Sequence, residues 1–314
     1  MTKLLKESDM AQGVAIIKQG GLVAFRTETV YGLGADATND NAVKKIFIAK
    51  SRPQTNPLIV HFHSLKHLKS YIDVPQEILP LFRVKGALTV VLKKGDCNIS
   101  QFVTGGQDTV ACRIPACGFA KKFIKAAGVP IAAPSANTST RPSPTRWQDV
   151  YDDLNNRIEA IFMGGQTKIG VESTVVLWSG GKINILRQGG VDANTLEKIT
   201  KLPVAVSKDN AKLVKSPGTK FKHYTPNVPL HIIKEDSSVQ SDGVILCRTA
   251  NKKKYPKTAK IIPLGNTAKQ IQANLFAAFR DAEKLNPIQI LIEQMPNTEE
   301  FSSINDRIQK AATK

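Results

Sequence analysis

Short apolar runs alternate with amphipathic segments along the first part of the chain, up to about residue 200. The apolar runs have the length of buried strands, and the amphipathic segments repeat apolar positions every three or four residues, as one face of a helix does. Asn39 or Asp40 can begin one such helix, because both side chains accept hydrogen bonds from free backbone N–H groups. Val43, Ile46 and Phe47 form its apolar stripe. The expected strands cover residues 22–25, 58–60, 88–92, 109–113 and 129–133, and the other expected helices cover residues 8–18, 119–127 and a short stretch from Ser64.

Two further apolar runs, residues 175–178 and 183–186, flank the sequence S-G-G-K at residues 179–182. A glycine pair between two strand-like runs predicts a tight β-hairpin. A hairpin within an otherwise alternating order of strands and helices indicates a mixed α/β sheet. The first domain is therefore expected to be a mixed, twisted sheet over residues 1–203.

The pattern changes between residues 204 and 229, which are rich in Lys and Pro and have no clear period. Such a segment is typical of a linker. Beyond it, short apolar runs return and predict a smaller, Rossmann-like α/β domain over residues 230–314. Its expected strands are residues 230–233, 243–246, 260–262 and 288–292, and Leu275, Ala278 and Phe279 mark a helix between the last two.

Composition sets the class of protein without naming its function. The 314 residues are 41% hydrophobic and 22% charged, which is ordinary for a globular protein with a real core. No apolar run approaches a membrane span, and the charged N-terminal residues predict no signal peptide, so we expect a cytoplasmic protein without a membrane partner. The net charge of +18 favours contact with nucleotides or nucleic acid, although it is spread over both parts of the chain.

Metal chemistry has weak support in the sequence. Cys97, Cys112, Cys117 and Cys247 show no C-x-x-C spacing. The three histidines at residues 61, 63 and 67 have no accompanying acidic or Cys cluster, so a zinc site is the less favoured interpretation. No Ser-His-Asp or Cys-His set is visible at a recognisable spacing, and we expect catalysis by positioning and electrostatics.

Five segments rich in small and polar residues follow expected strands or helices, where binding residues often concentrate. Together with the charges of Lys50 and Arg52 they indicate a nucleotide site, but none matches the P-loop or the G-x-G-x-x-G pattern. They are residues 26–34, residues 50–57, residues 134–137, residues 164–174 and residues 216–218.

These segments carry a resemblance. Residues 27–34 read T-E-T-V-Y-G-L-G, and residues 50–58 read K-x-R-P-x-x-N-P-L. The signatures P-S-A-N, G-x-E-S-T-V-V, L-R-x-G and S-P-G-x-K-x-x-H-Y-x-P follow in order. In these motifs the chain resembles the threonylcarbamoyl-AMP synthases of the two-domain form, which join a YrdC-type catalytic domain to a C-terminal domain.

The resemblance implies roles for particular residues. Lys50 and Arg52 would act in catalysis. The residues expected around threonine are Thr29, His61, Arg113 and Ser173, and those expected at ATP are Arg52, Asn56, Thr109, Ser135, Ser143, Arg187 and Tyr224. An arginine suits the threonine carboxylate, because its planar fork can bind both oxygens.

The implied reaction joins L-threonine, bicarbonate or CO2 and ATP. A carbamate forms on the threonine amine, its oxygen attacks the α-phosphate, and pyrophosphate leaves. Magnesium is expected on the triphosphate, with protein ligands that the sequence does not identify. The product would pass to a tRNA threonylcarbamoyltransferase as the downstream partner.

Two departures from the family pattern are visible. Residues 84–89 read V-K-G-A-L-T where the family usually has W-P-G-P-L-T. Thr140 stands where a glycine usually follows P-S-A-N-x-S, and we expect strain there if the backbone needs a positive φ. Neither change removes a residue that is assigned to chemistry.

Two other functions stay open at this point: a non-catalytic protein that contacts tRNA or other RNA, and an ATP-dependent carbamoyl-transfer enzyme for another substrate. Aromatic residues are only 6% of the chain, which disfavours base stacking. Residues 216–226 carry Pro, Gly, His and Tyr as well as Lys, so we also expect this segment to act as a lid over the occupied site rather than as a plain tether.

Overall fold

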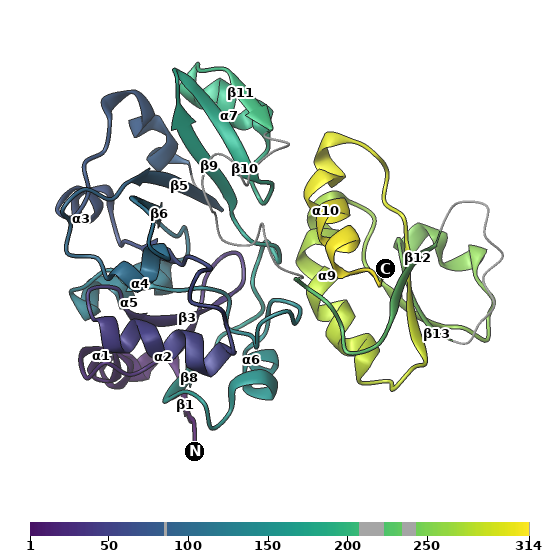
Figure 1. Ribbon diagram of the computed structural model, residues 1–314. Helices are drawn as coiled ribbons and strands as arrows, with labels where there is room; N and C mark the ends of the chain where they lie inside the picture. The colour runs from purple at the N-terminus through teal and green to yellow at the C-terminus, as the bar shows by residue number, and fades with distance from the viewer. Residues whose placement is uncertain (85–86, 207–222, 234–242, 314) are drawn as a thin grey trace.

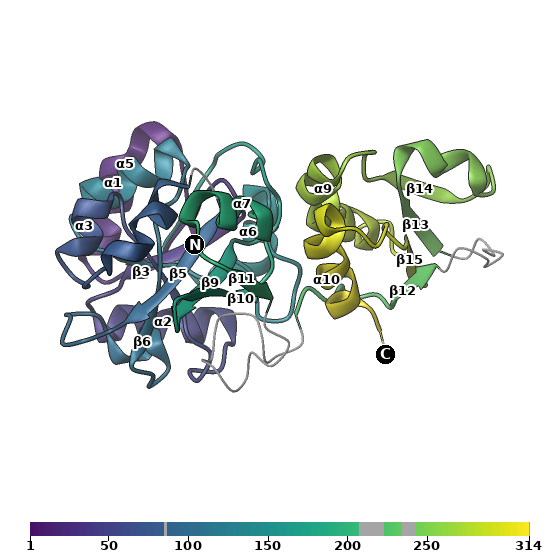
Figure 2. The same cartoon turned by 90° about the horizontal axis from the view of Figure 1, so that it is seen from above.

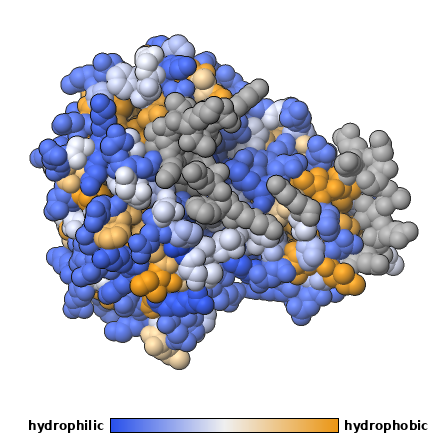
Figure 3. Space-filling model, viewed as in Figure 1, coloured by the Kyte–Doolittle hydropathy of each residue, from blue (hydrophilic) through white to orange (hydrophobic). Residues whose placement is uncertain are grey.

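The computed structural model describes residues 1–84, 87–206, 223–233 and 243–313. It forms two domains that meet along the helices of the second, as Figure 1 shows. None of the described helices is both long enough and apolar enough to cross a membrane. The face seen in Figure 3 is mostly hydrophilic, with apolar side chains in small separated groups.

The first domain is built on a mixed sheet, as the sequence predicts. The strand order is β1-β8-β2-β3-β7-β4-β6-β5-β9-β10-β11. The strands are β1 Lys3–Leu5, β2 Val23–Arg26, β3 Tyr31–Asp36, β4 Ile59–His61, β5 Leu88–Lys93, β6 Thr109–Arg113, β7 Ile131–Ala132, β8 Ala160–Phe162, β9 Thr174–Ser179, β10 Lys182–Arg187 and β11 Val204–Val206.

Helices cover both faces of this sheet. Figure 2 shows α1 and α5 on one side and α2 on the other. Ile17 of α1 and Phe123 of α5 pack in one apolar core, and Ile46 of α2 packs in the other. The helices are α1 Met10–Lys18, α2 Asp40–Lys50, α3 Leu65–Lys69, α4 Gln101–Thr104, α5 Gly118–Ala127, α6 Trp147–Leu154 and α7 Ala193–Thr200, with 3-10 turns at η1 Glu7–Asp9 and η2 Gln76–Arg83.

Several local predictions are confirmed in detail. The side chain of Asn39 accepts hydrogen bonds from Asn41 N and Ala42 N and so caps α2. The predicted hairpin forms between β9 and β10, and its two glycines, Gly180 and Gly181, have φ of 58° and 73°. Positive φ at both central residues matches the type I′ turn that joins twisted strands well.

Four strands were missed, and one of them contradicts a predicted boundary. The segment 26–34 was expected to be a binding motif at the end of a strand, but its second half begins β3, and the short strands β1 and β8 gave no clear apolar run. The linker was predicted to begin at residue 204, yet residues 204–206 form β11, which pairs in parallel with β10. Pairing with an existing sheet edge overrides the weak local pattern, because main-chain hydrogen bonds do not depend on side-chain periodicity.

The second domain has a parallel four-stranded sheet in the order β12-β15-β13-β14. Figure 2 shows α9 and α10 between this sheet and the first domain. The elements are β12 Leu230–Ile233, β13 Gly243–Cys247, η3 Thr249–Lys254, β14 Lys260–Pro263, α9 Ala268–Glu283, β15 Gln289–Glu293, η4 Glu299–Phe301 and α10 Ser302–Ala311.

Charged pairs and close backbone packing join the domains. Arg146, before α6, pairs with Asp281 of α9 at 2.8 Å, and the buried Arg280 of α9 pairs with Asp153 at 2.9 Å. Gly170 lies so close to α9 that a Cβ there would be 2.2 Å from the carbonyl oxygen of Gln272. Only glycine permits such an approach.

Two expectations from the sequence fall largely outside the described residues. Most of the segment that was expected to be a lid lies in residues 207–222, and its described end begins at His223. The first departure from the family pattern includes residues 85 and 86, which are also outside the described part of the chain.

Candidate functional site

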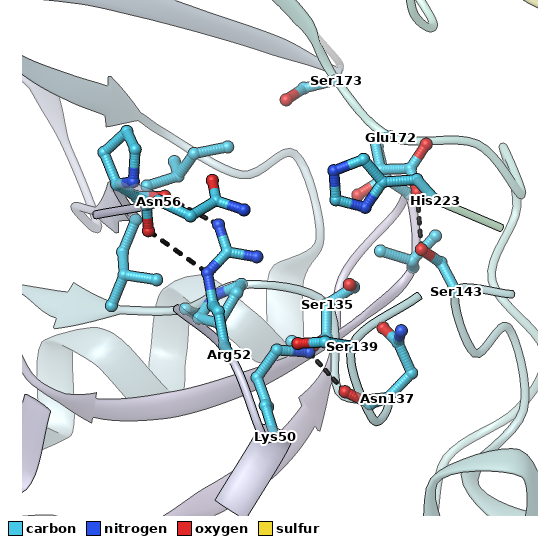
Figure 4. Close-up of a pocket in the computed structure, with 18 of the residues that line it drawn as sticks. Lys50, Arg52, Asn56, Ser135, Asn137, Ser139, Ser143, Glu172, Ser173 and His223 are labelled. Carbon is cyan, nitrogen blue, oxygen red and sulfur yellow. Dashed lines mark hydrogen bonds between the residues drawn. The ribbon is translucent and has the colours of Figure 1, made fainter. Parts of the chain in front are cut away.

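A cavity of about 260 Å³ opens in the first domain where several motif loops meet the ends of β4 and β6. His223 and Tyr224, at the entry to the second domain, complete its wall. Figure 4 shows Lys50 and Arg52 across the cavity from Glu172 and His223. Every site residue predicted from the sequence lines this cavity except Thr109.

Thr109 lies at the wrong end of its strand for this site. It begins β6, where it pairs with Lys93, whereas Arg113 ends the strand at the cavity. Four residues of extended chain separate the two positions by about 13 Å. The structure therefore gives no support to a nucleotide contact by Thr109.

The end of the cavity nearest Arg113 is small and closely bonded, and we call Glu28, Thr29, His61 and Arg113 the strand-end group. Arg113 Nη2 donates to Glu28 Oε1 at 2.7 Å and to Thr29 Oγ1 at 2.9 Å. Burial alone would raise the pKa of Glu28, but the charge and hydrogen bond of Arg113 bring this pKa below its usual value. Sequence reasoning missed this carboxylate, although it stands inside the T-E-T motif.

Two buried nitrogens in the strand-end group, Arg113 Nε and His61 Nδ1, lack a hydrogen-bond partner among the described residues. Burial, and then the charge of Arg113, lowers the pKa of His61 to about 3, so its imidazole is neutral. This end of the cavity thus offers a fixed cation beside a neutral hydrogen-bonding ring, which suits a small amino-acid carboxylate.

Ser173 lies behind this group in a loop that is bonded to β10. Its hydroxyl is 2.7 Å from that of Thr89, and Arg187 Nη2 donates to its carbonyl at 2.9 Å. The L-R-x-G motif ends at Gly189, where a Cβ would lie 2.4 Å from the backbone of the Ser173 loop. The glycine therefore lets β10 approach the loop closely.

Lys50 supports a loop of the cavity rather than standing free within it. It ends α2, is 1% exposed, and donates to the carbonyls of Ser135 and Asn137 at 2.5 Å each. Burial, and then the charge of Arg52, lowers the pKa of this ammonium well below its usual value. Both described bonds hold the P-S-A-N loop in place.

Arg52 is held with its guanidinium at the cavity. Its Nε and Nη2 donate to the carbonyls of Asn56 and Pro57 at 3.2 and 2.9 Å, which fixes the plane of the side chain. Desolvation, and then the charge of Arg187, lowers the pKa of Arg52 to about 9, so it stays protonated at neutral pH. A fixed cation of this kind can bind phosphate oxygens.

Thr140 confirms the strain expected from the sequence, with φ of 77°. Its carbonyl accepts a hydrogen bond from Thr225 N at 2.8 Å, and the neighbouring Tyr224 also has a positive φ of 65°. The two strained residues therefore lie where the chain enters the second domain. A positive φ costs about 1–2 kcal/mol for a residue with a Cβ.

Glu172 and Tyr224 receive contacts from the second domain. Ser143 donates to Glu172 Oε1 at 2.5 Å, and Arg307 of α10 donates to Glu172 Oε2 at 3.0 Å. The ring of Tyr224 stacks on Phe276 of α9, with centroids 5.1 Å apart. The G-x-E-S-T motif contains Glu172, but no sequence signal connects it to Arg307.

The described residues do not fit a magnesium ion held by the protein. Glu172 is the only carboxylate among the described residues lining the cavity, and both of its oxygens already accept hydrogen bonds. Magnesium prefers several free oxygen ligands. Any magnesium would arrive with the nucleotide as part of the substrate.

Comparison with known proteins agrees with the motifs. The family described as "Telomere recombination" matches residues 15–189, and the one described as "Threonylcarbamoyl-AMP synthase, C-terminal domain" matches residues 191–313. The threonylcarbamoyl-AMP synthase of Pyrococcus abyssi is 36% identical, over 98% of this chain and 95% of its own. That of Bacillus subtilis is 37% identical, over 98% and 93%.

Three-dimensional comparison gives the same answer for both domains together. The crystal structure of Pyrococcus abyssi Sua5 complexed with L-threonine has a TM-score of 0.87 and 34% identity, and the match covers 99% of this chain and 97% of that one. The motifs, the two domains and near full-length identity above 30% agree with one another. The chain belongs to the family of two-domain threonylcarbamoyl-AMP synthases.

Proposed function

We propose that this protein makes threonylcarbamoyl-AMP and pyrophosphate from L-threonine, bicarbonate or CO2 and ATP. The threonylcarbamoyl group would then be transferred to tRNA in the cytoplasm by a separate transferase. The observation that carries the proposal is the strand-end group, where the buried Arg113 lies beside the neutral His61 in the same cavity as Arg52. The similar synthases and the threonine complex of Sua5 support it.

Threonine binds at the strand-end group in this proposal. The guanidinium of Arg113, whose Nε has no partner among the described residues, takes the carboxylate, and Thr29, His61 and Ser173 surround the rest of the molecule. A buried, charge-assisted hydrogen bond is among the stronger contacts that a protein makes. The buried Glu28 fixes the orientation of Arg113, so the arginine does not need to reorganise when threonine arrives.

ATP binds toward Arg52 and Arg187, near the side chains of Asn56, Ser135, Ser143 and Tyr224. The cationic residues that line the cavity attract the triphosphate, and Lys50 keeps the P-S-A-N loop in position. Magnesium on the triphosphate would supply further charge neutralisation. The protein itself contributes placement and fixed positive charge.

The chemistry then proceeds in two steps. The neutral threonine amine attacks the carbon of CO2, forms the C–N bond and releases one proton, which leaves a carbamate anion. A carbamate oxygen attacks the α-phosphorus, a new P–O bond forms, and the bond to the β-phosphate breaks to release pyrophosphate. Arg52 stabilises charge on the departing phosphates.

Mass spectrometry of the product tests the proposal. With ATP, threonine and ¹³C-bicarbonate, the expected product is threonylcarbamoyl-AMP carrying one heavy carbon, and pyrophosphate release should depend on threonine. Valine, which lacks the hydroxyl, should react with kcat/KM lower by about 10⁴-fold if the site hydrogen-bonds that hydroxyl. Equal pyrophosphate release with valine, or without any amino acid, would contradict the proposal.

A further inference from the structure

A single carboxylate stands in a cavity that is otherwise suited to a polyanion. Among the described residues that line it, five are cationic and only Glu172 is acidic. The five are Lys50, Arg52, Arg113, Arg141 and Arg187. An unpaired carboxylate here would repel a triphosphate strongly, because charges interact with little screening in a partly buried site.

Arg307 compensates this charge from the other domain. It lies on α10, is fully buried, and donates through Nε to Glu172 Oε2 at 3.0 Å. Its Nη1 is held by Asp306 at 2.6 Å, so the side chain is fixed in direction. The charge of Arg307 lowers the pKa of Glu172, against the effect of burial, and the carboxylate stays ionised.

The same arginine also contacts Tyr224, at the entry to the second domain. Its guanidinium lies over the ring of Tyr224, 5.4 Å from the centroid, and Tyr224 lines the cavity. Ser143, which also lines the cavity, is bonded to the far oxygen of Glu172 at 2.5 Å. One buried side chain of α10 is thus connected, directly or through Glu172, to three groups that line the cavity.

We propose that Arg307 is a positioning residue for ATP. It neutralises Glu172, orients Ser143 through that carboxylate and packs directly over Tyr224, so that the site binds a triphosphate only when the second domain is docked. The inference rests on the proposed function for its ligand. Its role differs from simple adhesion, which the Arg146–Asp281 pair also provides without touching a cavity residue.

Calorimetric titration of ATP and of AMP, at one fixed magnesium concentration, tests the inference. Arg307→Met should weaken ATP binding by about tenfold, because a buried carboxylate is left uncompensated. It should weaken AMP binding by less than about threefold, because AMP carries less negative charge than ATP and is repelled less by an uncompensated carboxylate in the same cavity. Arg307→Lys should bind ATP with intermediate affinity, since it restores the charge but not the fork.

A second variant separates charge from packing. Adding Glu172→Gln to Arg307→Met removes the uncompensated charge and should recover most of the lost ATP affinity, as a coupled pair does in a double-mutant cycle. The matched control is Asp281→Asn, which breaks an interdomain pair remote from the cavity and should change ATP affinity by less than about twofold. If Arg307→Met does not fold, Arg307→Lys and Glu172→Gln/Arg307→Met carry the comparison.

The possible results separate the proposed function from the proposed role of Arg307. Failure of the wild-type protein to bind ATP would contradict the proposed function. ATP binding by Arg307→Met as tight as wild type would overturn only the role of Arg307. Equal losses for ATP and AMP, with no recovery in the double variant, would show that Arg307 acts through packing and would also overturn it.

Discussion

The two ends of the cavity are built in different ways. The strand-end group sits on one domain: β4 and β6 end side by side, and Glu28, Thr29, His61 and Arg113 are already hydrogen-bonded or buried there. The part of the cavity wall around Glu172 depends on loops and on both domains, through Glu172, Tyr224 and Arg307. Strand ends can fix the few side chains that bind an amino acid. The larger and more charged nucleotide would instead be bound by loops and by side chains from two domains.

Substitution of Arg113 should produce the largest difference between the two ends. Arg113→Ala removes the carboxylate partner and leaves Glu28 buried without its cation, which should cost about 3–5 kcal/mol in threonine binding. ATP affinity should change less, because the phosphates are expected at Arg52 and Arg187 rather than at Arg113. Calorimetric titration of each ligand measures both values, and Arg113→Lys serves as the control that retains charge. Unchanged threonine affinity in Arg113→Ala would contradict the assignment of threonine to the strand-end group.

Arg52→Ala is the reciprocal experiment. It removes a fixed cation from the expected path of the leaving pyrophosphate and should lower the rate of adenylation by about 2–4 kcal/mol in activation free energy. Threonine affinity should stay within about twofold of wild type. Single-turnover release of pyrophosphate, with threonine titration alongside, gives both results. A loss of threonine affinity as large as that of rate would show that the two ends are not separable.

The protonation state of His61 affects the stability of the protein through the strand-end group. Its pKa is about 3 in the folded protein and near 6.5 when unfolded. The unfolded chain therefore binds the extra proton between these values, and His61 makes the protein lose stability as pH falls from about 6.5, by up to about 1.4 kcal/mol per pH unit.

Denaturant unfolding of the wild type and of His61→Gln at pH 7 and pH 5 measures this effect. The wild type should lose about 1–2 kcal/mol more than the variant between the two values. Equal losses in the two proteins would mean that His61 takes up a proton in the folded state, against its buried position.

Thr140, which also lines the cavity, offers the smallest effect. Thr140→Gly relieves the positive φ but makes the unfolded chain more flexible, so the net gain should be about 0.5–1 kcal/mol in unfolding free energy. Ser139→Gly is the matched control, because φ at Ser139 is not positive and the change should destabilise by about 0.5–1 kcal/mol. Destabilisation by Thr140→Gly would show that its side chain matters more than its backbone.

Much of the fold could be predicted from the conformational preferences of single residues or pairs of residues. The cap at Asn39, the glycine pair of the hairpin and the special backbone at Thr140 each follow from one or two residues. The strand β11, which moves the start of the linker past residue 206, did not, because pairing in a sheet joins segments that carry no common local pattern.

The site could be predicted only in part, because it also depends on contacts between segments that are distant in the sequence. Motifs placed Arg52, His61 and Arg113 in one cavity, but Thr109 shows that membership of a motif-bearing strand does not decide which end of that strand faces the ligand. The pairing of Glu172 with Arg307 spans two domains, and a charged residue in an amphipathic helix is normally expected to face solvent.

The position of Arg307 in the chain also has a consequence for how the protein is made. Arg307 leaves the ribosome 135 residues after Glu172. Domains generally fold as units, the earlier one first, during synthesis. A nascent first domain would therefore already hold its strand-end group while Glu172 still faced the cavity without its cation. On this account a chain interrupted before α10 would bind threonine yet hold little ATP, and incomplete molecules would not consume nucleotide.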